Sequence, residues 1–328
     1  MSAFLALFDN LIFRIGSNPA LPLPRISCSR LLSSPTWDET VVPPAHARRF
    51  PVFFSACAGM ERADYVVIMK ALIAGTAFDN VSMEEAVVRI TQMAQKTDTP
   101  RVICTGNLDH LVMLQKDTDF RAIYQAADLV LADGAPIVWL SHLCGTPLKE
   151  RVTGSDLFWE LGRASAKTGL RLFFLGGSPG AAARAADAVH GRYPSAIVCG
   201  SYCPPKETFD TPQEQQHIWE VVRNAQPDIL LVGFGAPKQE KWIQANKELI
   251  GVPVSIGVGG TFEMAGGIVK RAPKWMQASG MEWCWRLAQE PGRLFRRYFM
   301  NDLPFLLVLT TRIIADRMRP KATEQPAA

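Results

Sequence analysis

The chain has 328 residues, of which 48% are hydrophobic, and this predicts one large or two small globular domains with a substantial core. Its seven cysteines include no CxxC pair, which argues against a zinc site or a disulfide framework and favours a reduced compartment. The net charge of +4 is uneven, because residues 270–328 hold 11 Lys and Arg against 5 Asp and Glu.

The first 62 residues are predicted to lie outside the folded core. Residues 1–16 carry apolar side chains at helical spacing but lack the basic start and small-residue cleavage site of a signal peptide, which favours a surface amphipathic helix or simply an irregular N-terminus. Residues 18–51 are rich in Pro and Ser without apolar periodicity, as in a disordered arm. No window of the chain approaches the roughly 18 uninterrupted apolar residues of a membrane-spanning helix, so we expect a soluble or peripheral protein.

Strand-like and helix-like segments then alternate as far as residue 258. The expected strands are 65–69, 101–105, 128–132, 170–175, 196–200, 228–233 and 252–258. The expected helices begin at the capping box Ser82-Met-Glu-Glu85 and at Asn107, and cover 135–144, 155–167, 181–190, 213–225 and 238–249. This alternation predicts an α/β fold with a Rossmann-like, mainly parallel sheet, helices on both faces and binding groups at the carboxyl ends of the strands.

Five expected strand ends carry small, polar or charged residues. They are Thr105-Gly-Asn107, Ala132-Asp-Gly134, Gly176-Gly-Ser-Pro-Gly180, Gly233-Phe-Gly-Ala-Pro-Lys-Gln239 and Gly257-Val-Gly-Gly-Thr-Phe262. One glycine turn is ordinary in an α/β protein, but five at one edge of a sheet favour a nucleotide-type ligand held by helix N-termini. The candidate phosphate-binding residues are therefore Gly176, Gly177, Ser178, Lys238, Gly259 and Gly260. Neither the Gly-x-Gly-x-x-Gly spacing nor a P-loop is present, which argues against a dehydrogenase or an NTPase.

Several charged residues have two interpretations. Asp133 can cap a helix or act as a general base, because partial burial raises the pKa of a carboxyl towards the working range. Arg151 can be a surface ion-pair partner or the cation that holds a leaving diphosphate. Asp117-Thr-Asp119 matches the Asp-x-Asp of metal-dependent sugar transferases, but it lies in a polar helical surface, so we expect it to be solvated and predict no metal site. The histidines lack ligand-like spacing and are expected to be surface or cap residues: His46, His110, His142, His190 and His217.

Taken together, these residues resemble the WecG/TagA/CpsF family of bacterial glycosyltransferases, which is glycosyltransferase family twenty-six. The resemblance covers about residues 66–300. It rests on four of the five strand ends, all except the turn at 176–180. It also rests on Glu150-Arg-Val-Thr-Gly154, Lys270-Arg-Ala-Pro273, Gly280-Met-Glu-Trp283, Arg286-Leu and Glu290-Pro-Gly-Arg293. One departure is Gly106, where many members have proline.

The resemblance implies an inverting transferase that uses no bound metal or other cofactor. Such enzymes move a sugar, commonly of the N-acetylmannosamine type, from a UDP-sugar to a polyprenyl-diphosphate-linked saccharide at the inner face of the membrane. The aspartate that matches Asp133 is the family's proposed base, and the residues that match Thr105, Asn107, Arg151 and Gln239 line its active site.

The resemblance also implies a basic C-terminal appendage that closes over the substrate and meets the lipid diphosphate, here with Arg286, Arg293, Arg296 and Arg297. We therefore expect an N-terminal extension at 1–62, an α/β core at 63–270 and a helical appendage at 271–328. Arginines around the apolar segments 305–309 and 313–314 suit a helix that lies on an anionic membrane. The alternative is a helix packed on the domain or on another subunit of a homo-oligomer.

The leading functional hypothesis is a cytoplasmic glycosyltransferase, peripheral to the inner face of the plasma membrane, in the assembly of exopolysaccharide, capsule or a cell-wall polymer. A transferase with a soluble acceptor would leave the basic and apolar tail unexplained. A non-catalytic nucleotide-sugar-binding scaffold would not need both Asp133 and Gln239. No nucleic acid is expected among the partners.

Overall fold

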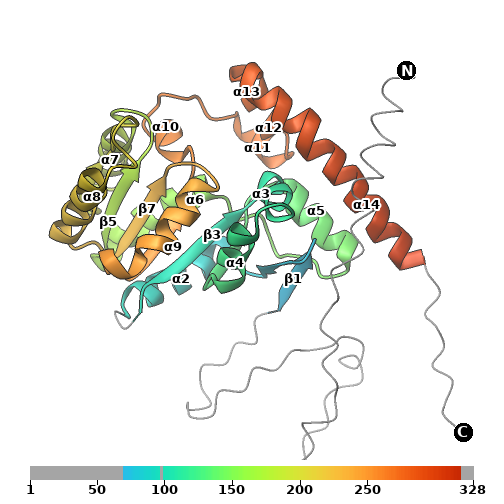
Figure 1. The fold of residues 1–328 in the computed structure, drawn as a ribbon, viewed down its shortest axis with the longest axis horizontal. Helices are drawn as coiled ribbons and strands as arrows, with labels where there is room; N and C mark the ends of the chain where they lie inside the picture. Colours follow the sequence, from blue (N-terminus) through green and yellow to red (C-terminus); the bar gives the residue numbers. More distant parts are fainter. Residues whose placement is uncertain (1–68, 97–98, 319–328) are drawn as a thin grey trace, which may run out of the picture. The chain divides into compact units, whose positions relative to one another are not determined.

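The computed structural model describes residues 69–96 and 99–318 (Figure 1). The predicted N-terminal extension and residues 65–68 of the first predicted strand lie outside the described residues, and Met69 is not in a strand. The first described element is an antiparallel hairpin of β1 (Lys70–Ile73) and β2 (Thr76–Asp79). Its two-residue turn, Ala74 and Gly75, has positive φ at both positions, as tight hairpins require.

The central sheet has six parallel strands in the order β4-β3-β8-β7-β5-β6. They are β3 (Arg101–Gly106), β4 (Leu129–Ala132), β5 (Arg171–Gly176), β6 (Ile197–Tyr202), β7 (Ile229–Gly233) and β8 (Val254–Gly257). The six strands predicted after residue 100 are confirmed, with ends shifted by one or two residues. After β4 the chain crosses to the other half of the sheet, and β7 and β8 fill the centre. In such sheets, ligands bind at the carboxyl ends of the strands, where the strand order changes direction.

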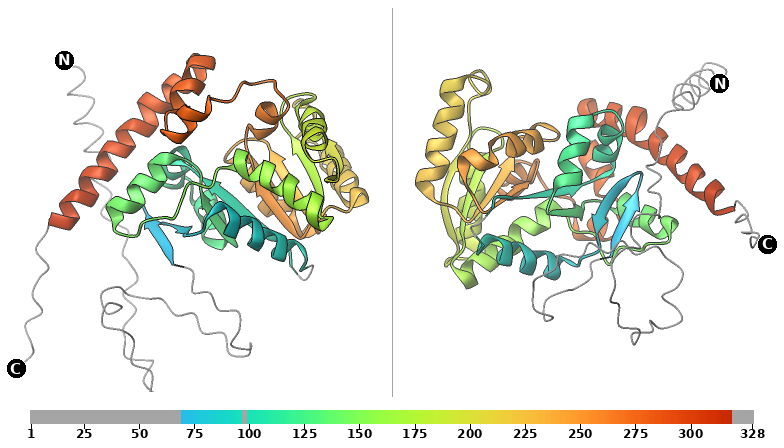
Figure 2. Two further views of the ribbon diagram at one scale, coloured as in Figure 1. Left: turned by 180° about the vertical axis from the view of Figure 1, so that it is seen from behind. Right: turned by 60° about the horizontal axis from the view of Figure 1, so that its bottom comes forward.

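Helices cover both faces of this sheet because alternate strand residues point to opposite sides (Figure 2). One face packs against α3 (Leu108–Leu114), α4 (Thr118–Ala126), α5 (Ala135–Cys144), α8 (Pro212–Ala225) and α9 (Lys238–Ile250). The other face packs against α2 (Met83–Ala94), α6 (Gly154–Thr168), α7 (Ala181–Arg192) and α10 (Thr261–Ala265). The predicted capping box of α2 is present, since Ser82 Oγ accepts from the Glu85 N–H and Glu85 Oε2 from the Ser82 N–H.

After α10, a helical appendage crosses the carboxyl end of the sheet (Figure 1). It consists of α11 (Lys274–Ala278), α12 (Glu282–Gln289), α13 (Pro291–Phe295), the π-helical segment η3 (Arg296–Asp302) and α14 (Leu303–Met318). One side of α14 packs against the hydrophobic core on the sheet face that α3, α4, α5, α8 and α9 cover, through Phe305, Leu306, Leu309 and Ile313. By length and composition alone, the helical stretch Arg296–Met318 could cross a membrane, and only 6% of its apolar window is buried. Asp302 and Arg312 interrupt this stretch, so the sequence has no uninterrupted apolar window there.

Candidate active site

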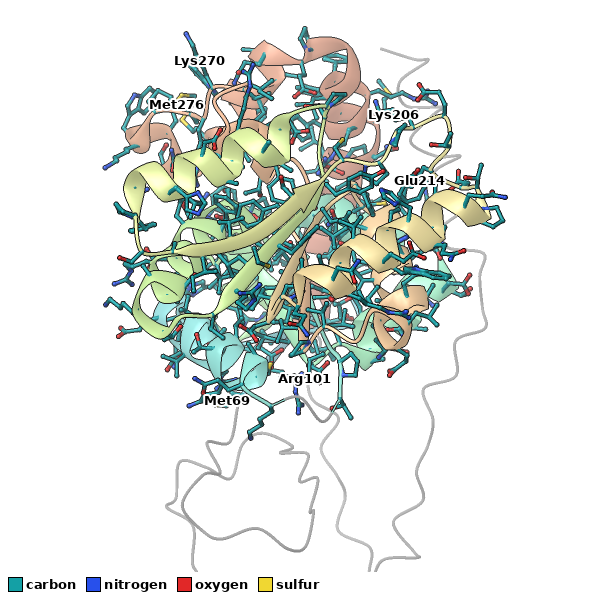
Figure 3. All side chains as sticks on the ribbon, turned by 90° about the vertical axis from the view of Figure 1, so that its left-hand side faces the viewer. Met69, Arg101, Lys206, Glu214, Lys270 and Met276 are labelled. Carbon is teal, nitrogen blue, oxygen red and sulfur yellow. The ribbon has the colours of Figure 1, made fainter. Side chains whose placement is uncertain are left out.

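A cavity of about 1020 Å³ lies at the carboxyl ends of the parallel strands, between the strand-end turns and the appendage. In Figure 3, Lys206 and Lys270, which both line it, lie at the end of the molecule opposite Arg101, the first residue of β3. The predicted site residues that line this cavity are Thr105, Asn107, Asp133, Arg151, Gly177, Ser178, Gln239, Gly259, Gly260, Arg286 and Arg297. The structure thus brings together polar groups that are up to 192 residues apart in the chain.

Three predicted site residues are placed differently, and for a fourth, Arg293, the structure does not test the prediction. Gly176, Lys238 and Arg296, all within the described part of the chain, do not line the cavity. The ammonium of Lys238 lies 3.4 Å from the centroid of the Phe209 ring, where it makes a cation–π contact. Arg296 is exposed. The backbone of Arg293 lies in α13, and its side chain is outside what the structure describes.

Asp133 follows β4, and its carboxyl lies at the N-terminus of α6. Its Oδ2 accepts a hydrogen bond from the Gly154 N–H at 3.4 Å, so the carboxyl interacts with the first turn of that helix. Burial raises the pKa of Asp133 to about 6; Glu282 adds to this rise, while the Gly154 N–H, Arg151 and Arg286 oppose it. A carboxyl with this pKa suits a general base near neutral pH, so the capping and catalytic interpretations are compatible.

Thr105 and Asn107 stand at the end of β3, where each also serves the fold. The Thr105 hydroxyl donates to the Gly257 carbonyl at 2.9 Å, which ties β3 to β8. Asn107 Oδ1 accepts from the His110 N–H at 3.1 Å and caps α3. These bonds fix both side chains and leave the Asn107 amide nitrogen as the group that can donate to a ligand.

The prediction that His110 is a surface or cap residue is wrong. Its side chain is buried between α3 and α4, against the rings of Phe120 and Tyr124. His110 Nδ1 lies 2.5 Å from the Tyr124 hydroxyl oxygen. Burial, with a smaller contribution from Arg297, lowers the pKa of His110 to about 3, so the ring is neutral at physiological pH. Phe120 and Tyr124 on α4, which follow His110 in the chain, supply this environment.

Gln239 is fixed on three sides at the start of α9. Its Oε1 accepts from the N–H groups of Gly235 at 3.1 Å and Gly259 at 3.0 Å, and its Nε2 donates to Glu240 Oε1 at 2.8 Å. One amide hydrogen therefore remains, so Gln239 can act towards a ligand only as a donor. A β-carbon at Gly257 would lie 2.6 Å from Gln239 Nε2, which explains why β8 ends in glycine.

The glycine-rich turn after β5 offers fewer free N–H groups than its sequence suggests. The Gly177 N–H donates to the Gly233 carbonyl at 2.9 Å, and the Ser178 N–H donates to Glu263 Oε1 at 2.7 Å. At Gly176, where φ is +103°, a β-carbon would lie 2.7 Å from the Phe234 ring. This turn therefore serves close packing between β5 and β7 more than phosphate binding.

Two residues that had no assigned role, Arg271 and Glu282, join the site. Glu282 Oε2 lies 3.6 Å from Arg151 Nη1, and Glu282 Oε1 lies 3.7 Å from Arg271 Nε. Arg271 Nη1 lies 2.7 Å from Asp156 Oδ1 on α6. Both residues fall within the segments 270–273 and 280–283, which carry part of the family resemblance, and this resemblance was the signal available in the sequence.

A second ion-pair group holds the appendage to α3. Arg297 Nε lies 3.1 Å from Asp109 Oδ2 and 3.6 Å from Asp302 Oδ2. Asp302 is almost wholly buried, and burial raises its pKa to about 6 although Arg297 opposes the rise. Arg297 therefore already has carboxylate partners in the protein.

Asp117-Thr-Asp119 is part of the helical surface, as predicted. Asp117 caps α4 through Oδ1, which accepts from the Phe120 N–H at 2.9 Å, and its Oδ2 lies 2.6 Å from Lys241 Nζ. Asp119 is exposed in the first turn of α4. Among residues 69–96 and 99–318, no three His, Cys, Asp or Glu side chains are grouped so that they could hold a metal ion.

Comparison with known proteins gives consistent matches. The model of the glycosyl transferase WecG/TagA/CpsF family matches residues 71–319. An N-acetylglucosaminyldiphosphoundecaprenol N-acetyl-beta-D-mannosaminyltransferase from Bacillus subtilis (strain 168) is 31% identical over 192 residues, which are 58% of this chain and 73% of the relative. The enzyme of the same name from Bacillus spizizenii (strain ATCC 23059 / NRRL B-14472 / W23) is 29% identical over 191 residues, 58% of this chain and 72% of the relative.

Proposed function

Because the chain belongs to the WecG/TagA/CpsF family of glycosyltransferases, we propose that it transfers a sugar from a UDP-sugar to a polyprenyl-diphosphate-linked saccharide. The sugar is of the N-acetylmannosamine type or a hexose, and the product enters an exopolysaccharide, capsule or cell-wall polymer. The names of the two relatives, which specify an undecaprenyl diphosphate acceptor, support the acceptor class. The observation that carries the proposal is Asp133, a carboxyl with a raised pKa in a cavity lined by arginines.

In the proposed reaction, Asp133 accepts the proton of the acceptor hydroxyl while that oxygen attacks the anomeric carbon of the donor. The bond from this carbon to UDP breaks in the same step, so a single displacement inverts the configuration. Arg151 balances the charge that develops on the departing UDP, and the free amide hydrogen of Gln239 donates to one of its oxygens. These donors make the metal-independent reaction reasonable, because fixed positive groups perform the role that a divalent cation has elsewhere.

The appendage fits a peripheral position on the anionic inner face of the plasma membrane. The side of α14 that does not contact the core exposes Leu303, Leu307, Ile314 and Met318. Arg312 and Arg317 are exposed on the same helix, and Arg296 is exposed in η3. Apolar side chains with interspersed arginines are the composition of helices that lie in a membrane interface, which supports a position of the cavity next to a lipid-linked acceptor. The same exposed face is the one that a homo-oligomer would use.

An assay with lipid-linked acceptors tests the proposal. The purified full chain is incubated with N-acetylglucosaminyl diphosphate on a short prenyl chain and a panel of UDP-sugars, in excess EDTA, and the product linkage is read by NMR. We expect transfer from a UDP-N-acetylmannosamine-type donor with inversion at the anomeric carbon. Binding of UDP without turnover of any donor would favour a scaffold, and equal transfer to a free sugar would favour a soluble acceptor.

A further inference from the structure

One carboxylate of the appendage stands between two guanidinium groups of the cavity. Glu282 is the first residue of α12, and its two oxygens face Arg151 at 3.6 Å and Arg271 at 3.7 Å. Both distances exceed those of hydrogen bonds, so the pairs are held by charge without directed bonds. All three side chains line the cavity and keep about a fifth of their surface exposed. Glu282 therefore occupies the cation pair without a directed hydrogen bond to either guanidinium.

The cation pair has unused donor capacity. Arg271 uses Nη1 for Asp156, but its Nε and Nη2 have no hydrogen-bond partner among the described residues although both atoms are buried. Buried guanidinium N–H groups normally find an acceptor, and their planar fork matches the oxygens of a phosphate. A ligand with more acceptor oxygens than one carboxylate would satisfy Arg271 better than Glu282 does.

The position of Glu282 also carries an electrostatic disadvantage. It faces the same part of the cavity as Asp133, and its negative charge adds to the rise in the pKa of that carboxyl. The other charged groups that influence Asp133 are Arg151 and Arg286, which act in the opposite direction. Two carboxylates near the same cations repel each other, so the Glu282 ion pairs are weaker than those of an isolated partner; a diphosphate meets the same repulsion and has to offset it through its hydrogen bonds to Arg271.

We propose that Arg151 and Arg271 form a subsite for a substrate diphosphate, and that Glu282 occupies this subsite in the ligand-free protein as a stand-in that the diphosphate displaces. The inference rests on the proposed function, which supplies two diphosphates, those of the UDP-sugar and of the prenyl acceptor. Because the carboxylate and the phosphate compete for the same guanidinium groups, Glu282 lowers the apparent affinity for the ligand.

The test measures diphosphate binding without turnover. Wild type and Glu282→Gln are titrated separately with UDP and with farnesyl diphosphate by calorimetry at fixed ionic strength. We expect Glu282→Gln to bind at least one of them about fivefold or more tightly, the lower range of typical coupling between two ligands. The matched control is Glu160→Gln, which removes a carboxylate paired with Arg163 on the surface of α6 and should leave both affinities unchanged.

Two further variants tie the gain to Arg271. In the double variant Glu282→Gln with Arg271→Gln, the gain in diphosphate affinity should disappear. If this variant does not fold, Arg271→Gln is replaced by Arg271→Lys, which keeps the positive charge but loses the planar guanidinium group. A gain with UDP alone assigns the subsite to the donor, and a gain with farnesyl diphosphate alone assigns it to the acceptor. Equal or weaker binding by Glu282→Gln, while wild type binds a diphosphate, overturns the inference and leaves the proposed function intact. If wild type binds neither diphosphate, both fail.

Discussion

Asp133→Asn is expected to inactivate the protein and to stabilise it at the same time. The pKa of Asp133 rises from its usual 3.8 to about 6, chiefly because burial disfavours the charged form. A difference of this size corresponds to about 3 kcal/mol, and this is an upper bound because the side chain keeps some contact with solvent. The folded protein therefore loses stability when Asp133 ionises, and a neutral asparagine of the same shape avoids that loss.

The sign of the effect depends on pH. Below about pH 3 the carboxyl is protonated in both the folded and the unfolded chain, so Asp133 has no effect on stability through ionisation. As pH rises from about 4 to 6 the unfolded chain ionises first, and the free energy of unfolding falls until the folded carboxyl also ionises. The gain from Asp133→Asn should therefore be full above pH 6.5, small at pH 4 and absent below about pH 3.

Both consequences are measured on one pair of proteins. Chemical denaturation of wild type and Asp133→Asn at pH 7.5 and pH 4 gives the stability difference, and transfer assays give kcat/KM. We expect a gain of about 1–3 kcal/mol at pH 7.5, and a loss of about 10²–10⁴-fold in kcat/KM. A variant that is less stable than wild type at pH 7.5, or that turns over normally, refutes the assignment of a desolvated base to Asp133.

Three further predictions concern the active site and the appendage. In wild type, kcat/KM should fall about tenfold per pH unit below pH 6 as Asp133 is protonated. Arg151→Ala should move this acidic limb of the pH profile to higher pH, and Glu282→Gln should move it to lower pH. An acidic limb that stays in place in both variants would contradict the charge environment of Asp133. Gln239→Glu should reduce kcat/KM and lower the melting temperature, because a carboxylate replaces an amide whose nitrogen lies 2.8 Å from Glu240 Oε1. Full activity of the Gln239→Glu protein would exclude the role of Gln239 as a hydrogen-bond donor to the substrate. The double variant Arg296→Glu with Arg312→Glu should weaken binding to anionic liposomes, measured by co-sedimentation, by more than tenfold, since each cation near such a surface contributes about 1 kcal/mol. The control Lys167→Glu on α6 should leave this binding unchanged. Equal sedimentation of the double variant and the control would remove the membrane role from the appendage.

Substituting exposed arginines is a sharper test of the appendage than removing it. One side of α14 packs against the hydrophobic core of the α/β domain through Phe305, Leu306, Leu309 and Ile313. A truncation near Gly292 would therefore uncover apolar surface of that domain. Loss of activity after truncation would then mix unfolding with loss of membrane contact. The sequence pattern alone, with arginines around apolar runs, did not distinguish a packed side of α14 from an exposed one.

The course of the sheet could be predicted because its signals are local. Buried strands appear as short apolar runs, several of which end in glycine, and parallel topology brings their carboxyl ends to one edge, so the turns at Thr105 and Gly257 were expected at the same edge. The hydrogen bond from the Thr105 hydroxyl to the Gly257 carbonyl, 152 residues away, requires in addition that β3 and β8 be neighbours, and this strand order was not predicted.

The use of individual donors could not be predicted, because it depends on partners that are distant in the chain. The Ser178 N–H looks free at a helix start, yet Glu263, 85 residues later, accepts from it. Lys238 looks like a phosphate ligand at the start of α9, yet its ammonium makes a cation–π contact with the Phe209 ring. Arg297 looks like a ligand for a lipid diphosphate, yet Asp109 and Asp302 already pair with it.

Occupation of the Arg151 and Arg271 subsite by a diphosphate would also act on the base. A phosphate carries more negative charge than the Glu282 carboxylate, so its arrival near Asp133 raises the pKa of that carboxyl further and makes it a stronger proton acceptor. Departure of the ligand restores the weaker base and allows Glu282 to return. The displaced carboxylate and the strengthened base are thus two results of one change in local charge, which couples binding of the substrate to readiness for proton transfer without a metal ion at the base.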